Sequence, residues 1–122
     1  MTELTADLFR TVDPSTAIAD GAVLPYYLAE RRLRISVARV DGRLYAFHDL
    51  CTCTNEACPL SGGLLTGTTL MCQCHGSRFD ITTGAVVNGP ATAALSVYEV
   101  QEVDGEIRIG AVRDQPRPER TG

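Results

Sequence analysis

Five cysteines of this 122-residue chain fall into two short segments, and none lies elsewhere. Residues 72–80 read Cys-Gln-Cys-His-Gly-Ser-Arg-Phe-Asp and place Cys72 and His75 at C-x-x-H spacing. Residues 51–59, about twenty positions upstream, read Cys-Thr-Cys-Thr-Asn-Glu-Ala-Cys-Pro, and this interval is long enough for a hairpin to bring the two segments together. Two loops rich in soft ligands can hold one metal cluster between them, so the fold has to present both loops side by side.

The cysteine count and the bulk composition exclude several other classes. An odd number of cysteines in a chain without a secretory signal pattern argues against a disulfide scaffold. The chain contains no run of ~20 apolar residues, so we expect no membrane span and a soluble, cytoplasmic protein. A net charge of −4 without a basic stripe argues against nucleic acid as a partner. The acidic charge itself fits ordinary solubility, or a face that docks on a basic redox partner.

Short alternating segments separated by turn signals predict an all-β fold. Residues 34–40 alternate as a half-buried strand, and Asp41-Gly42 is a hairpin turn that leads into residues 43–47. The same pattern recurs around Asp104-Gly105. The other expected segments are strands at residues 9–12, 23–28, 64–65, 68–71, 79–81, 95–103 and 106–109, a helical pattern at 15–19 only, and a proline-rich, disordered tail at 113–122.

Four motifs, in this order, resemble the Rieske family of [2Fe-2S] proteins: residues 58–63, 72–80, 83–86 and 89–91. The resemblance runs from residue 8 to residue 112, one domain whose cluster-binding loops would lie at about 48–63 and 71–91. It implies a Rieske-like antiparallel β-sandwich with a small cluster-binding subdomain, and a [2Fe-2S] cluster as cofactor.

The family holds its cluster with two cysteines on one iron and two histidines on the other. Its pattern of C-x-x-H in the second loop assigns Cys72 and His75. Its pattern of C-x-H in the first loop has no histidine here. Alignment from residue 41 onward puts Cys53 at the histidine position, after Cys51, whereas alignment back from residue 63 makes Cys53 the cysteine and puts Asn55 at the histidine position.

Ligand chemistry favours a set of three thiolates and one imidazole. Asparagine is a poor ligand for iron in a sulfide cluster, whereas thiolate is the preferred one. The added negative charge favours the oxidised state, so we expect a lower reduction potential than in a two-histidine centre, and a weaker pH dependence because one imidazole titrates. The predicted ligands are Cys51, Cys53, Cys72 and His75.

Five further residues receive roles. The resemblance implies a disulfide between Cys58 and Cys74, with a pair of buried thiols as the alternative. It also implies that the hydroxyl of Ser77 bonds a cluster sulfur, and that Pro90 belongs to the loop covering the cluster, although its sequence also fits a plain turn. His48 is expected to pack rather than to bind iron.

One-electron transfer is the only chemistry for which the sequence offers candidate residues, because it has no catalytic triad, carboxylate pair or phosphate loop. Small soluble members of the resembled family carry electrons from a flavin-dependent ferredoxin reductase to a terminal oxygenase. We therefore expect an electron carrier rather than an enzyme, with His75 as the electron exit. The alternatives are a cluster-free module like the small subunit of nitrite reductases, or a zinc site of three cysteines and one histidine.

Overall fold

The structure, a computed structural model, describes residues 9–50, 59–74, 76–89, 91 and 93–113. Within these ranges the chain forms ten β-strands and three short 3-10 helices, which confirms the all-β prediction. The strands are β1 (Arg10–Pro14), β2 (Val23–Leu28), β3 (Leu33–Val40), β4 (Arg43–His48), β5 (Leu64–Thr66), β6 (Thr69–Met71), β7 (Arg78–Asp80), β8 (Val86–Asn88), β9 (Val97–Val103) and β10 (Glu106–Val112), and the 3-10 helices are η1 (Ser15–Ala17), η2 (Ala29–Arg31) and η3 (Leu60–Gly62).

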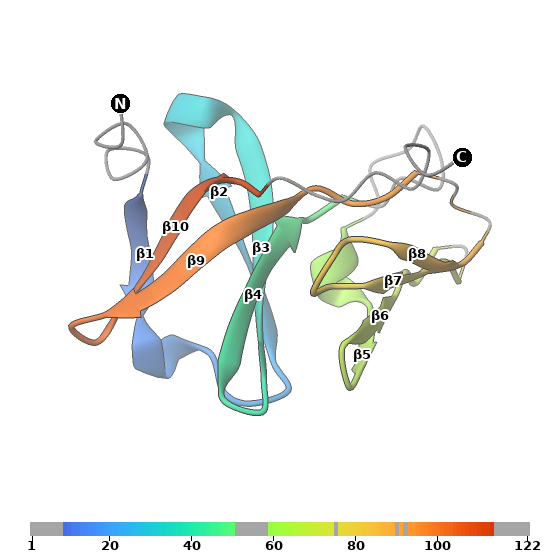
Figure 1. Cartoon of the computed structure of the whole chain (residues 1–122), viewed down its shortest axis with the longest axis horizontal. Helices are drawn as coiled ribbons and strands as arrows, with labels where there is room; N and C mark the ends of the chain where they lie inside the picture. Colours follow the sequence, from blue (N-terminus) through green and yellow to red (C-terminus); the bar gives the residue numbers. More distant parts are fainter. Residues whose placement is uncertain (1–8, 51–58, 75, 90, 92, 114–122) are drawn as a thin grey trace.

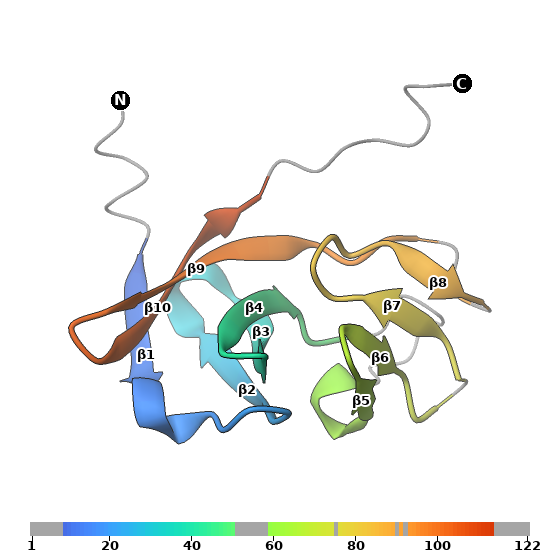
Figure 2. The same cartoon turned by 60° about the horizontal axis from the view of Figure 1, so that its bottom comes forward.

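The strands form two antiparallel sheets that lie beside each other (Figure 1). The larger has six strands in the order β1-β10-β9-β4-β3-β2, and the smaller has four in the order β5-β6-β7-β8. The smaller sheet lies next to β4 and the start of β9, and the view of Figure 2 separates its strands from the larger sheet. This arrangement is the scaffold with a small subdomain that the sequence predicted.

The buried side chains form two cores. The scaffold core receives side chains from β2, β3, β4, β9 and β10, and the partly buried Val12 of β1 packs against it. The shared core lies between the two sheets. The scaffold core consists of Ile18, Leu28, Ile35, Val37, Ala46, Tyr98, Ile107 and Ile109. The shared core consists of Ala38, Phe47, Leu60, Leu70, Cys72, Phe79, Ile81, Ala91, Leu95 and Val97.

Strand β3 corrects the prediction of a half-buried strand, because its middle is buried on both faces. Side chains alternate across a strand, so Ile35 and Val37 enter the scaffold core while Ala38 enters the shared core. The same division separates the neighbours Ala46 and Phe47 on β4. The second face is buried because the smaller sheet covers it, which the alternation of β3 alone does not reveal.

Other predicted boundaries moved by a few residues. The helical pattern at 15–19 is the 3-10 helix η1, β10 extends to Val112, and β9 begins at Val97 rather than at residue 95. Strand β8 was not predicted as a strand. The two Asp-Gly hairpin turns are confirmed, and both residues of each turn have positive φ.

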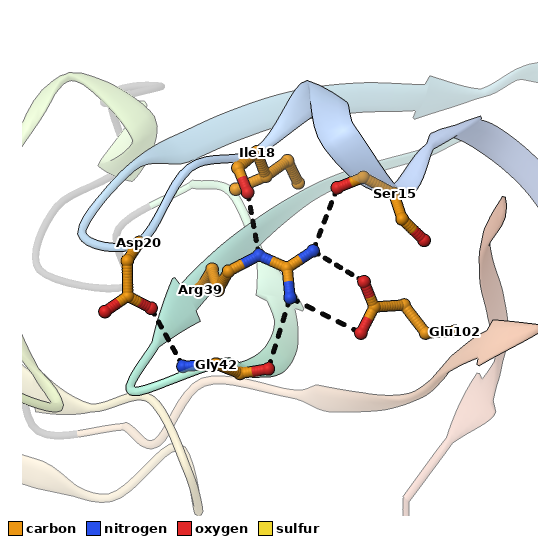
Figure 3. Close-up of polar contacts among 6 residues, drawn as sticks. All are labelled: Ser15, Ile18, Asp20, Arg39, Gly42 and Glu102. Carbon is orange, nitrogen blue, oxygen red and sulfur yellow. Dashed lines mark hydrogen bonds and ion pairs between the residues drawn. The ribbon is translucent and has the colours of Figure 1, made fainter. Parts of the chain in front are cut away.

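Arg39 connects η1, the turn between β3 and β4, and β9 at the end of the larger sheet where β3 turns into β4 (Figure 3). Its guanidinium donates to the backbone carbonyls of Ser15, Ile18 and Gly42, and it pairs with the carboxylate of Glu102 at 2.6 Å. The backbone N–H of Gly42 donates to Asp20 at 2.8 Å. This network fixes the turn between β3 and β4 against η1 and β9.

The ends of the chain lie mostly outside the described residues. The predicted tail begins at Arg113, whose N–H donates to the carbonyl of Val97 at 2.8 Å, and residues 114–122 are not among those described. The domain limits of residues 8 and 112 stay a prediction. Within the described ranges, no helix has the length and apolarity that crossing a membrane requires.

Candidate metal centre

The second cysteine loop, residues 72–77, joins β6 to β7 in a hairpin closed by its own backbone. The N–H of Cys72 donates to the carbonyl of Ser77 at 2.7 Å, and the N–H of Gly76 donates to the carbonyl of Cys72 at 3.0 Å. Gly76 adopts φ +80°, a conformation that glycine reaches without strain. The flanking pair of Met71 and Arg78 continues the ladder of the smaller sheet. The loop is thus anchored on both sides by regular structure.

Cys72 and Cys74 differ in their surroundings although only one residue separates them. Cys72 is fully buried in the shared core, together with Leu60 and Ala91. Cys74 is exposed and is one half of a disulfide. This state agrees with the predicted bridge, but Cys58 lies outside the described residues, so the pairing of these two cysteines stays a prediction.

Ser77 links the second loop to the segment that follows β8. Its side chain is completely buried, and its Oγ accepts the N–H of Ala91 at 3.0 Å. A hydroxyl that accepts one hydrogen bond keeps its own hydrogen for donation. Ser77 is therefore oriented by Ala91 and can still donate a bond to a cluster sulfur, as its predicted role requires.

The base of the first cysteine loop is held by Asp49, which is fully buried. The backbone carbonyl of Asp49 accepts the N–H of Leu60, and its Oδ1 accepts the N–H of Ser61 at 2.8 Å. Leu50 and Pro59 form a β-bridge next to these bonds. The residues on either side of segment 51–58 are thus bonded to each other.

The chain that follows the first cysteine loop reaches the second loop through η3 and the start of β5. The backbone of Gly63 lies so close to Met71 that a Cβ on Gly63 would sit 2.1 Å from the Met71 carbonyl oxygen. A Cβ on Gly62 would meet the side chain of Gln73 at 3.7 Å. The chain leaving the first loop therefore runs directly beside the entry of the second, which confirms the expected juxtaposition at the level of the flanking residues.

Most of the predicted ligands fall outside the described part of the chain. Only Cys72 of the four predicted ligands is described, so no group of three metal-binding side chains occurs among the described residues. What is described fits the predicted group: a buried thiol in a loop closed by backbone bonds, beside a buried hydroxyl donor. The predicted site residues outside the described ranges are Cys51, Cys53, Cys58, His75 and Pro90.

His48 is the last residue of β4, opposite Ile35 on β3, and it is half-buried. Its N–H donates to the carbonyl of Ser96 at 2.9 Å. Burial lowers the pKa of its imidazole, while the charge of Asp49 opposes this shift. A place within the strand ladder favours the packing role over iron ligation.

Sequence reasoning missed Asp49, although it stands two residues before Cys51. The only signal was indirect: Arg34 and Ser36 occupy the same face of β3, and both donate to the Asp49 carboxylate. A cavity of about 510 Å³ lies along β4 and β9, and none of the described cysteines or histidines lines it.

The sequence matches the family described as Rieske [2Fe-2S] domain over residues 9–99. The chain belongs to the Rieske [2Fe-2S] family. The cofactor of this family is the [2Fe-2S] cluster, which agrees with the buried Cys72 and Ser77 of the second loop.

Two curated Rieske relatives are ferredoxin components. Ferredoxin CarAc of Metapseudomonas resinovorans is 37% identical over 75 residues, which cover 62% of this chain and 68% of that protein. The ferredoxin component of the naphthalene 1,2-dioxygenase system of Pseudomonas aeruginosa is 33% identical over 89 residues, 73% of this chain and 81% of that protein. The first relative is thus a ferredoxin, and the second is the ferredoxin component of a dioxygenase system.

Two solved structures share the fold. A chain in the complex of reduced oxygenase and oxidized ferredoxin in carbazole 1,9a-dioxygenase has a TM-score of 0.79 and 27% identity, covering 89% of this chain and 98% of that chain. A putative NADH-dependent nitrite reductase small subunit from Mycobacterium tuberculosis has a TM-score of 0.74 and 17% identity, covering 87% and 96%. The second likeness is one of fold alone.

Proposed function

We propose that this chain is a one-electron carrier that passes electrons from a flavin-dependent ferredoxin reductase to a terminal oxygenase, and that it catalyses no turnover of its own. The observation that carries the proposal is the second loop, where Cys72 and Ser77 are buried side by side on a hairpin closed by backbone hydrogen bonds. The similarity of the chain to a ferredoxin and to the ferredoxin component of a dioxygenase system supports the choice of partners. A cytoplasmic location remains part of the proposal.

Cys51, Cys53, Cys72 and His75 would hold the cluster. The bound cluster supplies reversible uptake of one electron. The rest of the chain keeps water from the thiolate of Cys72 and orients the hydroxyl of Ser77. A rigid frame of this kind suits a carrier, because donors and charges that are already in place need little rearrangement when the electron arrives.

The deciding experiment is an absorption spectrum, followed by EPR of the dithionite-reduced protein after purification without oxygen. Visible bands and an EPR signal with an average g value below that of the free electron support the carrier. Iron and zinc are counted in the same sample. Rapid reduction by a flavoprotein reductase and reoxidation by an oxygenase then test the assigned partners.

The missing histidine of the first loop also favours a second candidate. Three cysteines and one histidine form a common structural zinc site, and a cluster-free module would share the fold. A protein that contains no iron and shows no visible bands would contradict the electron carrier. Bound zinc would then identify a zinc module, and the absence of both metals would identify a structural partner.

A further inference from the structure

Asp49 carries a buried charge immediately before the first ligand loop. Its side chain is 0% exposed, and its carboxylate accepts hydrogen bonds from Arg34 Nε at 2.6 Å, Ser36 Oγ at 2.5 Å and Ser61 N at 2.8 Å. We propose that Asp49, with Arg34 as its counter-ion, positions the first ligand loop and sets the reduction potential of the cluster. This inference rests on the proposed function.

The positioning part follows from where the bonds of Asp49 end. Its carbonyl oxygen holds the N–H of Leu60 and its carboxylate holds the N–H of Ser61, so one residue before the loop binds two residues after it. The loop that begins and ends at these bonds carries Cys51 and Cys53. Loosening either bond gives both thiolates more freedom, which weakens a site that depends on their separation from Cys72.

The electrostatic part follows from burial. Two residues of chain span at most about 7 Å, so the Cα atom of Asp49 lies within that distance of the Cα atom of Cys51. A buried charge acts through a lower effective dielectric than an exposed one, and iron–sulfur potentials respond to nearby net charge. The side chain of Arg34 is 44% exposed, so water screens part of its compensating charge.

Two substitutions are then expected to shift the potential in opposite directions. Asp49→Asn removes a negative charge beside the cluster, which favours the reduced state and raises the potential. Arg34→Gln leaves the buried carboxylate without its counter-ion, which favours the oxidised state and lowers the potential. A residue with a structural role only would weaken the fold in both variants without opposite shifts.

Glu102→Gln provides a matched control. Glu102 also pairs with an arginine at 2.6 Å, but it lies toward the far end of β9, whereas Val97 at the start of β9 contributes to the shared core beside the smaller sheet. The ion pair of Arg39 and Glu102 in Figure 3 therefore has the same chemistry, toward the opposite end of β9 from Val97. Its loss is expected to change stability and to leave the potential unchanged.

The experiment measures the reduction potentials of the cluster-loaded wild type, Asp49→Asn, Arg34→Gln, their double variant and Glu102→Gln, by EPR-monitored titration. A rise, a fall, a near-cancellation in the double variant and an unchanged control support the inference. Shifts of one common sign, no shift, or an equal shift in Glu102→Gln would overturn it.

A second variant keeps the test sharp if Asp49→Asn loses the cluster. Ser36→Ala removes one donor from the carboxylate, so its potential is expected to fall together with that of Arg34→Gln. Unchanged potentials in both would contradict the inference and leave the carrier function intact. A wild-type protein that takes up no iron would instead overturn the carrier function, and this inference with it.

Discussion

A side chain at position 63 has no room beside the carbonyl oxygen of Met71, because a Cβ there would lie 2.1 Å from that oxygen. Gly63→Ala must therefore push β5 away from β6, next to Cys72. Overpacking of this kind costs typically about 1–3 kcal/mol, so we expect a lower melting temperature and less bound iron. Gly62→Ala is the matched control, since its Cβ would make an ordinary contact at 3.7 Å. Equal iron content and equal melting temperature in the two variants would contradict the close approach.

Ser77→Ala separates the structural role of the hydroxyl from its role toward the cluster. The buried N–H of Ala91 would lose its acceptor, which costs about 1–3 kcal/mol and is seen as a lower melting temperature. Loss of a donor to a cluster sulfur would also lower the reduction potential. Thr66→Ala on the exposed edge strand β5 is the control. A destabilised variant with an unchanged potential would leave Ser77 with the structural role alone.

Cys51→Ser and Cys53→Ser decide the register of the first loop. If both thiolates bind iron, each variant retains less iron and changes the EPR spectrum of the reduced protein. Cys58→Ser, in the same loop, is expected to keep the cluster. Full iron and an unchanged spectrum in Cys51→Ser or in Cys53→Ser would remove that cysteine from the ligand set.

Cys74→Ser tests the predicted bridge to Cys58. A cross-link that closes a loop of roughly 15 residues contributes about 3 kcal/mol to stability, and less when the cluster itself already joins the two loops. We therefore expect a larger fall in melting temperature for the cluster-free protein than for the loaded one. Peptide mapping without reductant should join the peptides that contain Cys58 and Cys74, and a different partner for Cys74 would refute the pairing.

Glu102→Gln has an effect on stability that depends on pH. The hydrogen bond from Arg39 lowers the pKa of Glu102 below its ordinary value of 4.5. Stability from a lowered acid pKa is present above the ordinary value and is lost as the pH falls through the folded value. At pH 7 the variant should therefore have a lower melting temperature than the wild type, with a loss of at most about 1 kcal/mol in the free energy of unfolding. The melting temperatures of the two proteins should converge as the pH falls. A constant difference at every pH would exclude the charge of Glu102 as the cause.

The sequence predicted those parts of the fold that local chemistry decides. Asp41 and Asp104, each followed by glycine, have positive φ in the structure, so these hairpins follow from the turn residues. The second loop was also recognisable, because Cys72 and Ser77 belong to one continuous motif.

The parts that depend on distant residues were not predictable in this way. Asp49 is preceded by a strand and followed by cysteines, and nothing local indicates that Arg34 and Ser36 bury its charge. Nothing in the sequence around Gly63 indicates that the carbonyl oxygen of Met71, on β6, leaves no room for a side chain there. The first feature arises from the pairing of β3 with the chain that follows β4, and the second from the pairing of β5 with β6.

Ala46 and Phe47 are neighbours on β4, yet they face different cores. Strand β4 thus separates the scaffold core from the shared core, which contains Cys72. Detachment of the smaller sheet would expose Phe47, Ala38 and Val97 but would leave the scaffold core closed. Loss of the smaller sheet is therefore expected to remove the burial of the shared core alone, because other residues form the scaffold core.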